Sequence, residues 1–417
     1  MRVKKNVTLQ QVLTLMTGTA VSQGLFFILM VPLARLYTSD DFGNYAIYQS
    51  IAAIIVTIAA LKYDMSVMLP KIESEAVVVQ KLARACILLT SIAVTVIGAL
   101  FGILAQGRTG NWPIKYWLPA LGITVFLTAD TLNLQFWLNR NSKYKAISAN
   151  RIVQTVAISL FQLGLVLVGG GTNGLILGSI LGLLTGYIYA FHQVHSLPRV
   201  QAESYPTLVE MAKKYRKMPL LNGPTSIIDS IRLNGINILI ATISISSLGQ
   251  FNMAWKTVQA TSALIQSAIS QVLLRRLATV ERGKMRDLLS RTLRAIALAD
   301  VPLITILAIV IPWAIPFVFG AEWVEAGHVA QALCPWIAVN ILSSPTANVF
   351  VVTNKQGWLL LFSVVYCATP LLLLLLSPWA LIPTIWILSI SMGSLLIALI
   401  AIAFWVAQQY DQNKQLD

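Results

Sequence analysis

Charged residues are scarce in this chain, and long hydrophobic runs take their place. Aspartate, glutamate, lysine and arginine together make up 11% of the 417 residues, whereas hydrophobic residues make up 57%. A soluble globule of this length needs far more polar side chains to cover its surface. The composition therefore excludes a soluble protein and indicates that a lipid bilayer is the solvent.

Residues that supply redox, metal and acid–base chemistry are also few. The three cysteines, Cys86, Cys334 and Cys367, lie inside apolar runs without disulfide or metal-binding spacing, as small buried hydrophobes do. There are only three histidines, and no Ser-His-Asp order, phosphate loop or dinucleotide fingerprint is present. The sequence predicts no catalytic residue, no metal site and no cofactor.

Apolar windows of about 20 residues, the length of a helix that crosses the hydrocarbon, fill most of the chain. Runs such as Leu371–Leu376 are apolar on every face, which excludes the alternating strands of a membrane barrel. The predicted fold is therefore an all-α integral membrane protein with about 12 transmembrane helices. The spans are expected at residues 12–34, 44–63, 86–105, 117–138, 152–169, 174–191, 219–243, 250–272, 293–313, 328–350, 358–376 and 380–406.

The cations gather on alternate connections between these spans. The net charge is +14, and most of the 30 lysines and arginines lie at the two termini or after even-numbered spans. The other connections contain only Arg35, Arg108 and Lys115. The positive-inside rule then places both termini and the basic connections in the cytoplasm. Membrane topology explains the positive charge, and no nucleic-acid partner is predicted.

The chain divides into two similar halves. We predict an N-terminal six-helix bundle (1–200), a cytoplasmic linker (201–218) and a C-terminal six-helix bundle (219–417). The segment that starts at Asp41 resembles the one that starts at Ser247, and Arg84-Ala85 corresponds to Arg294-Ala295, at an offset of about 210 residues. Because both halves start on the same side, they are expected to be related by a parallel pseudo-two-fold axis and to face a central cleft.

Two helices combine polar side chains with an excess of cations. The seventh span has Asp229 and Arg232 three residues apart, hence on one helical face. Because a buried excess cation requires an anion, Arg232 and Lys256 of the eighth span are predicted to bind substrate. Alternatively, Asp229 neutralises Arg232 within the helix, and Lys256 extends toward the surface. The same stripes contain Asn222 and Ser226 in the seventh span, and Asn252, Gln259, Gln266 and Ser270 in the eighth.

Further ionisable residues stand alone in apolar surroundings or at helix ends. Asp130, with Asn133, and Asp300 are each explained either by interhelical hydrogen bonding or by ion coupling. Arg35, Lys62 and Asp64 lie at predicted helix ends. There, an interfacial role is the alternative to substrate contact or charge pairing.

Three segments resemble the O-antigen (Wzx-type) flippases, in the polysaccharide transporter branch of the multidrug/oligosaccharidyl-lipid/polysaccharide exporter superfamily. They are Pro32–Gly43, which reads PLARLYTSDDFG, Leu61–Asp64, which reads LKYD, and Phe319–Gly327, which reads FGAEWVEAG. Together with the helix count and the two halves, the resemblance covers essentially the whole chain. One departure is Lys62, where family members often have arginine; lysine keeps the charge but loses the bidentate fork.

The resemblance implies a flippase for oligosaccharide repeat units on undecaprenyl diphosphate. Such a protein moves its substrate from the cytoplasmic to the periplasmic leaflet of a bacterial inner membrane by alternating access, within lipopolysaccharide or other surface-polysaccharide biosynthesis. Its partners would be the bilayer and the polymerase and chain-length proteins of the same pathway. The diphosphate would bind the cleft cations Arg232, Lys256, Arg35 and Lys62, and sugars would contact Asn222, Asn252 and Gln259. The candidates for coupling to an H⁺ or Na⁺ gradient are Asp130, Asp229, Asp300 and Asp64.

Four other functions are weighed against this one. A drug or metabolite antiporter of the same superfamily should favour acids over cations in its cleft. A peptidoglycan-precursor flippase usually has two more helices. A membrane glycosyl polymerase or ligase is expected to have a large outer loop, and all the outer loops predicted here are short. An accessory subunit would have no use for costly buried cations.

Overall fold

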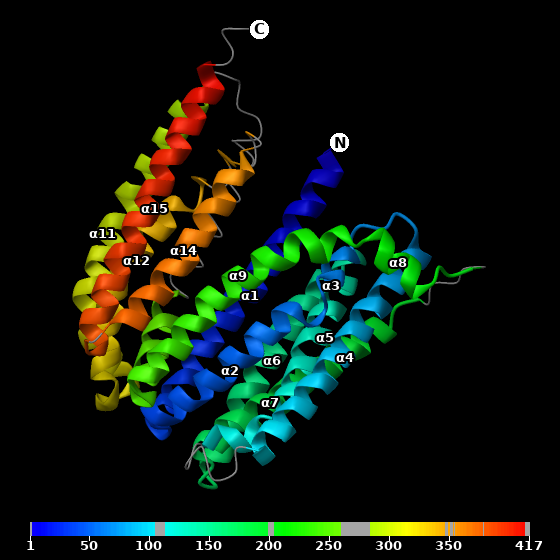
Figure 1. Ribbon diagram of the computed structural model, residues 1–417, viewed down its shortest axis with the longest axis horizontal. Coiled ribbons are helices and arrows are strands. Elements are labelled where there is room, and N and C mark those ends of the chain that lie inside the picture. The colour runs from blue at the N-terminus through cyan, green and yellow to red at the C-terminus, as the bar shows by residue number, and fades with distance from the viewer. Residues whose placement is uncertain are drawn as a thin grey trace. The chain divides into compact units, whose positions relative to one another are not determined.

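The computed structural model describes residues 2–104, 113–198, 204–259, 284–346, 349–350, 353, 355–377 and 379–412. Regular structure in this part of the chain consists of helices, without strands (Figure 1). Nine of its helices are long and apolar enough to cross a membrane. The all-α membrane fold is therefore confirmed, and the count of twelve spans stays a prediction.

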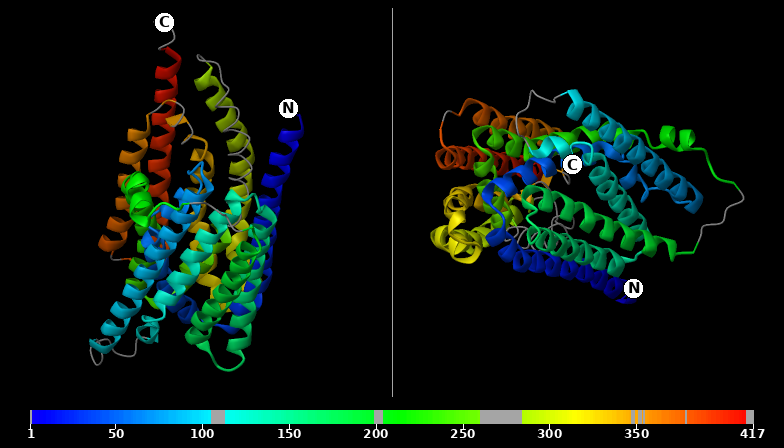
Figure 2. Two further views of the ribbon diagram at one scale, coloured as in Figure 1. Left: turned by 90° about the vertical axis from the view of Figure 1, so that its right-hand side faces the viewer. Right: turned by 90° about the horizontal axis from the view of Figure 1, so that it is seen from below.

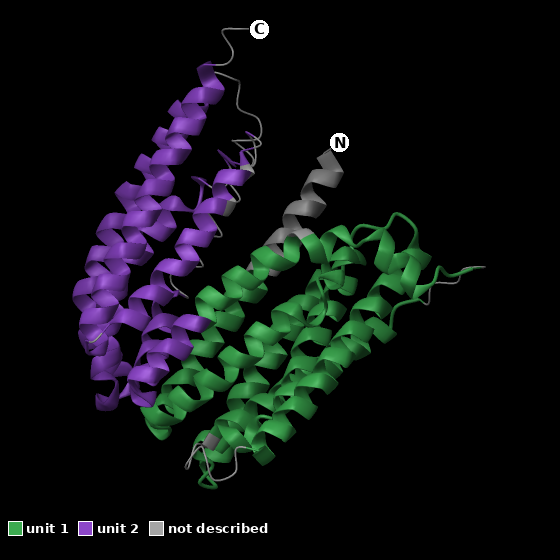
Figure 3. Ribbon diagram, viewed as in Figure 1, with its two compact units in different colours: residues 1–234 green, residues 235–417 purple. Residues whose placement is uncertain are grey.

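The helices form two compact units, Met1–Asn234 and Gly235–Asp417 (Figure 3). Unit 1 contains the following helices: α1 (Arg2–Leu36), α2 (Ser39–Ala59), α3 (Tyr63–Ser66), α4 (Glu73–Leu104), α5 (Leu121–Arg140), α6 (Tyr144–Val166), α7 (Gly171–His195), α8 (Leu208–Lys214) and the first part of α9 (Lys217–Ile243). Unit 2 contains the rest of α9, a helical segment at 245–259, α11 (Met285–Phe319), α12 (Val324–Ser343), α14 (Gln356–Leu376) and α15 (Leu381–Gln412).

Small residues set the closest helix packing of unit 1. Helices α6 and α7 lie side by side, as Figure 2 shows. A methyl group added at Gly178 would collide with Gln162, and one added at Gly182 would collide with Ile158. The two glycines therefore allow the backbones of α6 and α7 to approach closely.

Helix α5 lies at the centre of unit 1, packed against α2, α4 and α7. It is not among the nine apolar spans, although the sequence predicted a span there. Its polar residues include Thr124, Asp130 and Asn133, which are all buried against neighbouring helices. Polar side chains that face protein rather than lipid lower the hydropathy of a helix without preventing it from lying at membrane depth.

One end of unit 1 collects short polar connections. Thr38 and Asp41 form a capping box at the start of α2. Thr172 Oγ1 at the start of α7 donates to Asp41 Oδ1 (2.7 Å), and Trp117 Nε1 donates to Asn173 Oδ1 (2.7 Å). These contacts tie the α1–α2, α4–α5 and α6–α7 connections to one another.

The opposite end of unit 1 collects the basic connections. Arg140 Nη2 lies 3.0 Å from Glu73 Oε1, and Lys214 Nζ lies 2.5 Å from Glu75 Oε1. The hydrogen bond that Lys214 donates to the Glu75 carboxylate raises the pKa of Lys214. Met211 of α8 packs into an apolar cluster with α4 and Trp137. The described part of the predicted linker, residues 204–218, therefore belongs to unit 1, whose boundary falls inside α9; the assignment of six spans to each half stays a prediction.

In unit 2, α12 packs between α11 and α15. Pro335 lies inside α12, where proline removes a backbone donor and bends a helix. The next amide, of Trp336, donates to Ser389 Oγ of α15 (3.0 Å), and the indole Nε1 of Trp336 donates to Tyr366 OH of α14 (2.7 Å). Neutral hydrogen bonds thus connect α12 to α14 and α15 next to the proline.

Candidate functional site

The predicted polar stripe of the seventh span lies on α9. Arg232 Nη2 is 3.6 Å from Asp229 Oδ1, and the arginine side chain is 15% exposed against 63% for the aspartate. The intrahelical pair that the sequence offered as the structural explanation for Asp229 is therefore present. The binding role of Arg232 stays a prediction.

Asp229 of this stripe lies beside Ser230, through which α9 contacts α2. Thr57 Oγ1 of α2 donates to Ser230 Oγ (3.1 Å), which identifies the packed face. Asp229 lies one residue away, about 100° around the helix. Asn222, also on the stripe, is exposed and donates to Met218 Sδ (2.8 Å). Asp229 and Asn222 are both exposed on this stripe, whereas the Arg232 side chain is 15% exposed.

The eighth span is described up to residue 259, and the helical segment there belongs to unit 2. Asn252 Nδ2 lies 3.4 Å from Asn237 Oδ1 of α9. Lys256 is half-buried and Gln259 is exposed. Gln266 and Ser270, predicted on the same face, lie outside the described residues. The substrate contacts of Lys256, Asn252 and Gln259 stay predictions.

Two further predicted cations, Arg35 and Lys62, do not come together. Arg35 lies exposed in the last turn of α1, beside the polar end of unit 1, whereas Lys62 follows the far end of α2. The 21 residues of α2 separate the two ends by about 30 Å. One diphosphate group cannot contact both side chains in this arrangement of unit 1.

Lys62 lines a cavity of about 150 Å³ between the end of α2 and the start of α9. Leu61 and Lys62 both have left-handed backbone, with φ of 45° and 60°. Asp64 lies two residues on, and its buried Oδ1 has no hydrogen-bond partner among the described residues. Burial raises the pKa of Asp64, and its backbone hydrogen bond and the charge of Lys62 oppose that rise only partly.

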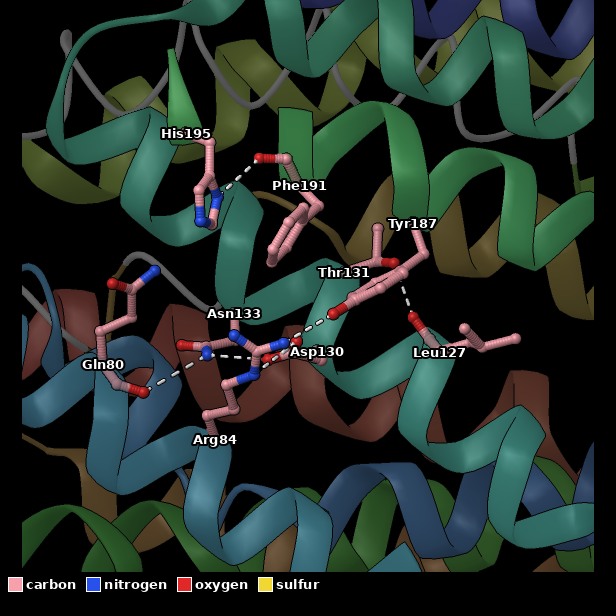
Figure 4. A network of polar contacts seen from close by, with 9 residues as sticks. All are labelled: Gln80, Arg84, Leu127, Asp130, Thr131, Asn133, Tyr187, Phe191 and His195. Carbon is pink, nitrogen blue, oxygen red and sulfur yellow. Dashed lines mark hydrogen bonds and ion pairs between the residues drawn. The ribbon is translucent and has the colours of Figure 1, made fainter. Parts of the chain in front are cut away.

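Asp130 is the centre of a polar network that joins α4, α5 and α7 (Figure 4). The side chain is fully buried; its Oδ2 lies 3.2 Å from Nε of Arg84, and its Oδ1 accepts from Asn133 Nδ2 (3.1 Å). Arg84 Nη2 donates to Tyr187 OH (2.7 Å), and the guanidinium lies 5.7 Å from the centre of the Phe191 ring. This is the interhelical bonding that the sequence offered as one explanation for Asp130; ion coupling stays a prediction.

Arg84 was not among the predicted site residues. The sequence does contain a signal for it: a cation lies close to the start of one apolar span, and an acid lies inside the next span. This signal identifies an ion pair only when the two helices are known to be neighbours. His195, next to Phe191 with a ring-centre distance of 4.0 Å, extends the network toward the basic end of unit 1. Its Nδ1 lies 3.2 Å from the carbonyl oxygen of Phe191 in the last turn of α7.

Asp300 differs from Asp130 in having no counter-charge within the part of the chain that the structure describes. It is 4% exposed within α11, and its Oδ1 has no hydrogen-bond partner among the described residues. In the same part of the chain, no group of three or more histidine, cysteine or acidic side chains could hold a metal ion. The choice between hydrogen bonding and ion coupling for Asp300 stays open at this point.

Comparisons with known proteins give the family and the fold. The family model "Polysaccharide biosynthesis protein" matches residues 32–328. The chain is similar to the structure of a lipid II flippase, MurJ, in an inward closed conformation, with a TM-score of 0.72, 13% identity, and coverage of 96% of this chain and 90% of that chain.

A second group of similar structures consists of multidrug resistance MATE family transporters of the MOP superfamily. An inward-facing structure gives a TM-score of 0.65 at 12% identity, covering 94% of this chain and 95% of that chain. An outward-facing structure gives a TM-score of 0.57 at 10% identity, covering 99% of this chain and 96% of that chain. The chain matches no curated protein sequence. This multi-pass membrane protein therefore belongs to the polysaccharide biosynthesis protein family and has the fold that MOP-superfamily flippases and transporters share.

Proposed function

We propose that this protein is a flippase for oligosaccharide repeat units linked to undecaprenyl diphosphate, the precursors of O-antigen or a related surface polysaccharide. The observation that carries the proposal is a family match to polysaccharide biosynthesis proteins over residues 32–328 in a chain that has a flippase fold. A polysaccharide assembled from lipid-linked units requires a membrane protein that moves a charged, hydrated head group through hydrocarbon. We place it in a bacterial inner membrane with both termini in the cytoplasm.

The chemistry of α9 supports this substrate. A diphosphate that leaves water needs cations and hydrogen-bond donors in place of its hydration shell. Arg232 is mostly buried and lies on the polar stripe of α9. Its guanidinium has five donors in a planar fork, a geometry that suits the oxygens of a diphosphate.

The second candidate is a cation-coupled antiporter, which the likeness to MATE transporters favours. The family match favours the flippase instead. For either function, we propose that an H⁺ or Na⁺ gradient drives the cycle, with Asp300 as the first candidate for the coupling residue. Asp130 ranks lower because a carboxylate already held by Arg84 is less available to a second cation.

Complementation tests the function. The host is a strain that lacks its own O-unit flippase and makes the matching sugar. It receives the intact protein, Arg232→Ala, Lys256→Ala or the control Arg291→Ala, each at the same level in the membrane. The amount of surface polysaccharide is then measured. Arg291 pairs with Asp287 in α11, with both side chains largely exposed, so the control removes an arginine outside the proposed site.

We expect the intact protein and the control to restore the polysaccharide and the two site variants to lose it. Restoration by all four would keep the function and overturn the site. Failure of the well-expressed intact protein, together with drug efflux that depends on a gradient, would replace the flippase with the antiporter. Collapse of the proton or the sodium gradient in separate arms identifies the coupling ion, and indifference to both overturns coupling.

A further inference from the structure

The cavity between α2 and α9 has an unusual combination of lining groups. Its wall is apolar, formed by Ile58, Leu61, Pro219, Pro224 and Ile227. Two polar side chains reach it, and one of them, the hydroxyl of Thr57, is already bonded to Ala53 O and Ser230 Oγ. The other is Lys62, whose ammonium group has no hydrogen-bonded or ion-paired partner among the described residues. The cavity therefore offers one available cation against a hydrophobic surface.

The local sequence explains why neighbouring side chains leave this space open. Pro219 and Pro224 lie in the first turns of α9, where Pro224 removes one backbone donor and disturbs the regular helix. Gly223 contributes no side chain, and a methyl group added there would meet nothing within 4 Å. Across the cavity, α2 ends in the left-handed residues Leu61 and Lys62. Left-handed backbone costs a non-glycine residue about 1–2 kcal/mol, and such strain concentrates at functional sites.

The volume limits what can bind. The cavity of about 150 Å³ is smaller than the range of about 300–1,000 Å³ usual for complete ligand sites. An oligosaccharide would also need many polar partners, and this wall has almost none. A phosphate group with a short length of hydrocarbon attached satisfies both the lysine and the apolar wall.

We propose that this cavity binds the polyprenyl phosphate end of the lipid carrier, with a phosphate oxygen on Lys62 and the first isoprene units against Leu61, Pro224 and Ile227. The proposal rests on the proposed flippase function and adds a second role to it: α2 and α9 recognise the carrier, independently of the sugars. Lys62 then acts apart from Arg35, from which the length of α2 separates it.

Binding to the purified full-length protein in detergent tests this assignment with farnesyl diphosphate, a short polyprenyl diphosphate without sugar. Inorganic pyrophosphate supplies the anion alone, and farnesol supplies the hydrocarbon alone. We expect farnesyl diphosphate to bind at least about tenfold more tightly than either, because only it uses both parts of the cavity.

Two variants locate the site. Lys62→Ala should weaken farnesyl diphosphate binding at least about tenfold, while Lys62→Arg retains most of it because the charge remains. Gly223→Leu fills the cavity from a position with open space and should abolish binding. The matched controls are Lys71→Ala, an exposed lysine outside the cavity lining, and Gly24→Leu, another helical glycine with nothing within 4 Å of an added methyl group. Both controls should bind as the intact protein does.

The outcomes distinguish a carrier-binding site from a free-anion site and from a cavity that binds neither. Unchanged binding in Lys62→Ala and in a monodisperse Gly223→Leu overturns the site. Equal binding of pyrophosphate and farnesyl diphosphate replaces the carrier site with a free-anion site and also overturns it. If Gly223→Leu is poorly folded, Lys62→Ala against Lys62→Arg decides alone. If the intact protein complements the strain but the variants do not change farnesyl diphosphate binding, only the cavity site is rejected. If farnesyl diphosphate binds at the cavity but the intact protein does not complement, only the flippase function is rejected.

Discussion

Asp130 in unit 1 and Asp300 in unit 2 are both buried carboxylates within apolar helices, yet their surroundings differ. Asp130 has Arg84 at 3.2 Å and Asn133 at 3.1 Å. Asp300 has an oxygen without a hydrogen-bond partner among the described residues. Arg294, the repeat counterpart of Arg84, is exposed. An acid in an apolar span therefore does not by itself indicate one role, because the role depends on which cation the neighbouring helix supplies.

The two units also connect their helices by different interactions. Unit 1 joins α4, α5 and α7 through the ion pair of Arg84 and Asp130. Unit 2 joins α12, α14 and α15 through neutral donors of Trp336. A buried ion pair is costly to leave half-broken, whereas a neutral hydrogen bond costs less. The difference predicts unequal responses to mutation in the two units.

The largest effect is expected for Arg84→Ala. It leaves the fully buried Asp130 without its counter-charge, and the free energy of unfolding should fall by about 3–5 kcal/mol. Thermal unfolding in detergent measures the loss. Arg291→Ala, which removes an exposed pair on α11, is the control and should change stability by less than about 1 kcal/mol. Equal melting temperatures for the two variants would show that Arg84 and Asp130 do not connect the helices.

A smaller effect is expected for Tyr366→Phe in unit 2. The change removes the acceptor of the Trp336 indole and leaves a buried donor, at a cost of about 1–3 kcal/mol. The same unfolding measurement compares it with Arg84→Ala. A loss as large as that of Arg84→Ala would contradict the distinction between the ionic and the neutral network.

Asp300→Asn should act in the opposite direction from Asp130→Asn. Removing a charge that has no counter-charge among the described residues should leave stability unchanged or raise it by about 1 kcal/mol, whereas Asp130→Asn weakens its ion pair and lowers stability. Both variants are unfolded side by side and scored for surface polysaccharide. If Asp300→Asn is stable but inactive, the unpartnered carboxylate serves transport. If it unfolds as readily as Asp130→Asn, Asp300 has a structural partner.

The smallest effect concerns Asp64, outside the membrane-spanning helices. Burial raises its pKa in the folded protein above the usual 3.8, so the folded state favours the protonated carboxyl. The resulting stability is full at low pH and is lost as the pH rises through the folded pKa. Asp64→Asn removes this dependence. We expect the melting temperature of the intact protein to fall more than that of the variant from pH 4 upward, and parallel curves would contradict the burial.

Much of the architecture could be predicted from the sequence because lipid imposes a simple rule. A long apolar run has to form a helix, since no water is present to satisfy its backbone, and cations stay on the connections. Helix α5, which the apolar windows predicted as a span, is not among the nine helices that are apolar enough to cross a membrane, because buried polar residues lower its hydropathy. The second span was predicted from residue 44, whereas α2 begins at Ser39 behind a capping box of Thr38 and Asp41 that the prediction did not use.

The site could be predicted only in part. The spacing of Asp229 and Arg232 was sufficient to predict their pairing, because helical geometry fixes which residues share a face. The partner of Asp130 lies 46 positions earlier in the sequence, on another helix, and no spacing rule connects them. Likewise, the sequence grouped Arg35 with Lys62 as cations, and the structure of unit 1 separates them by the length of α2.

The sequence by itself determined that the protein lies in a bilayer, that it is helical, and which ionisable residues lie within apolar spans. These features depend on the composition of single chain segments, because burial in hydrocarbon does. Tertiary structure alone decided which of those residues are neutralised. It placed Arg84 beside Asp130 and left a cavity beside Lys62. Contacts between helices depend on packing, since ion pairing requires two side chains within a few ångströms, and distance along the sequence does not measure that separation.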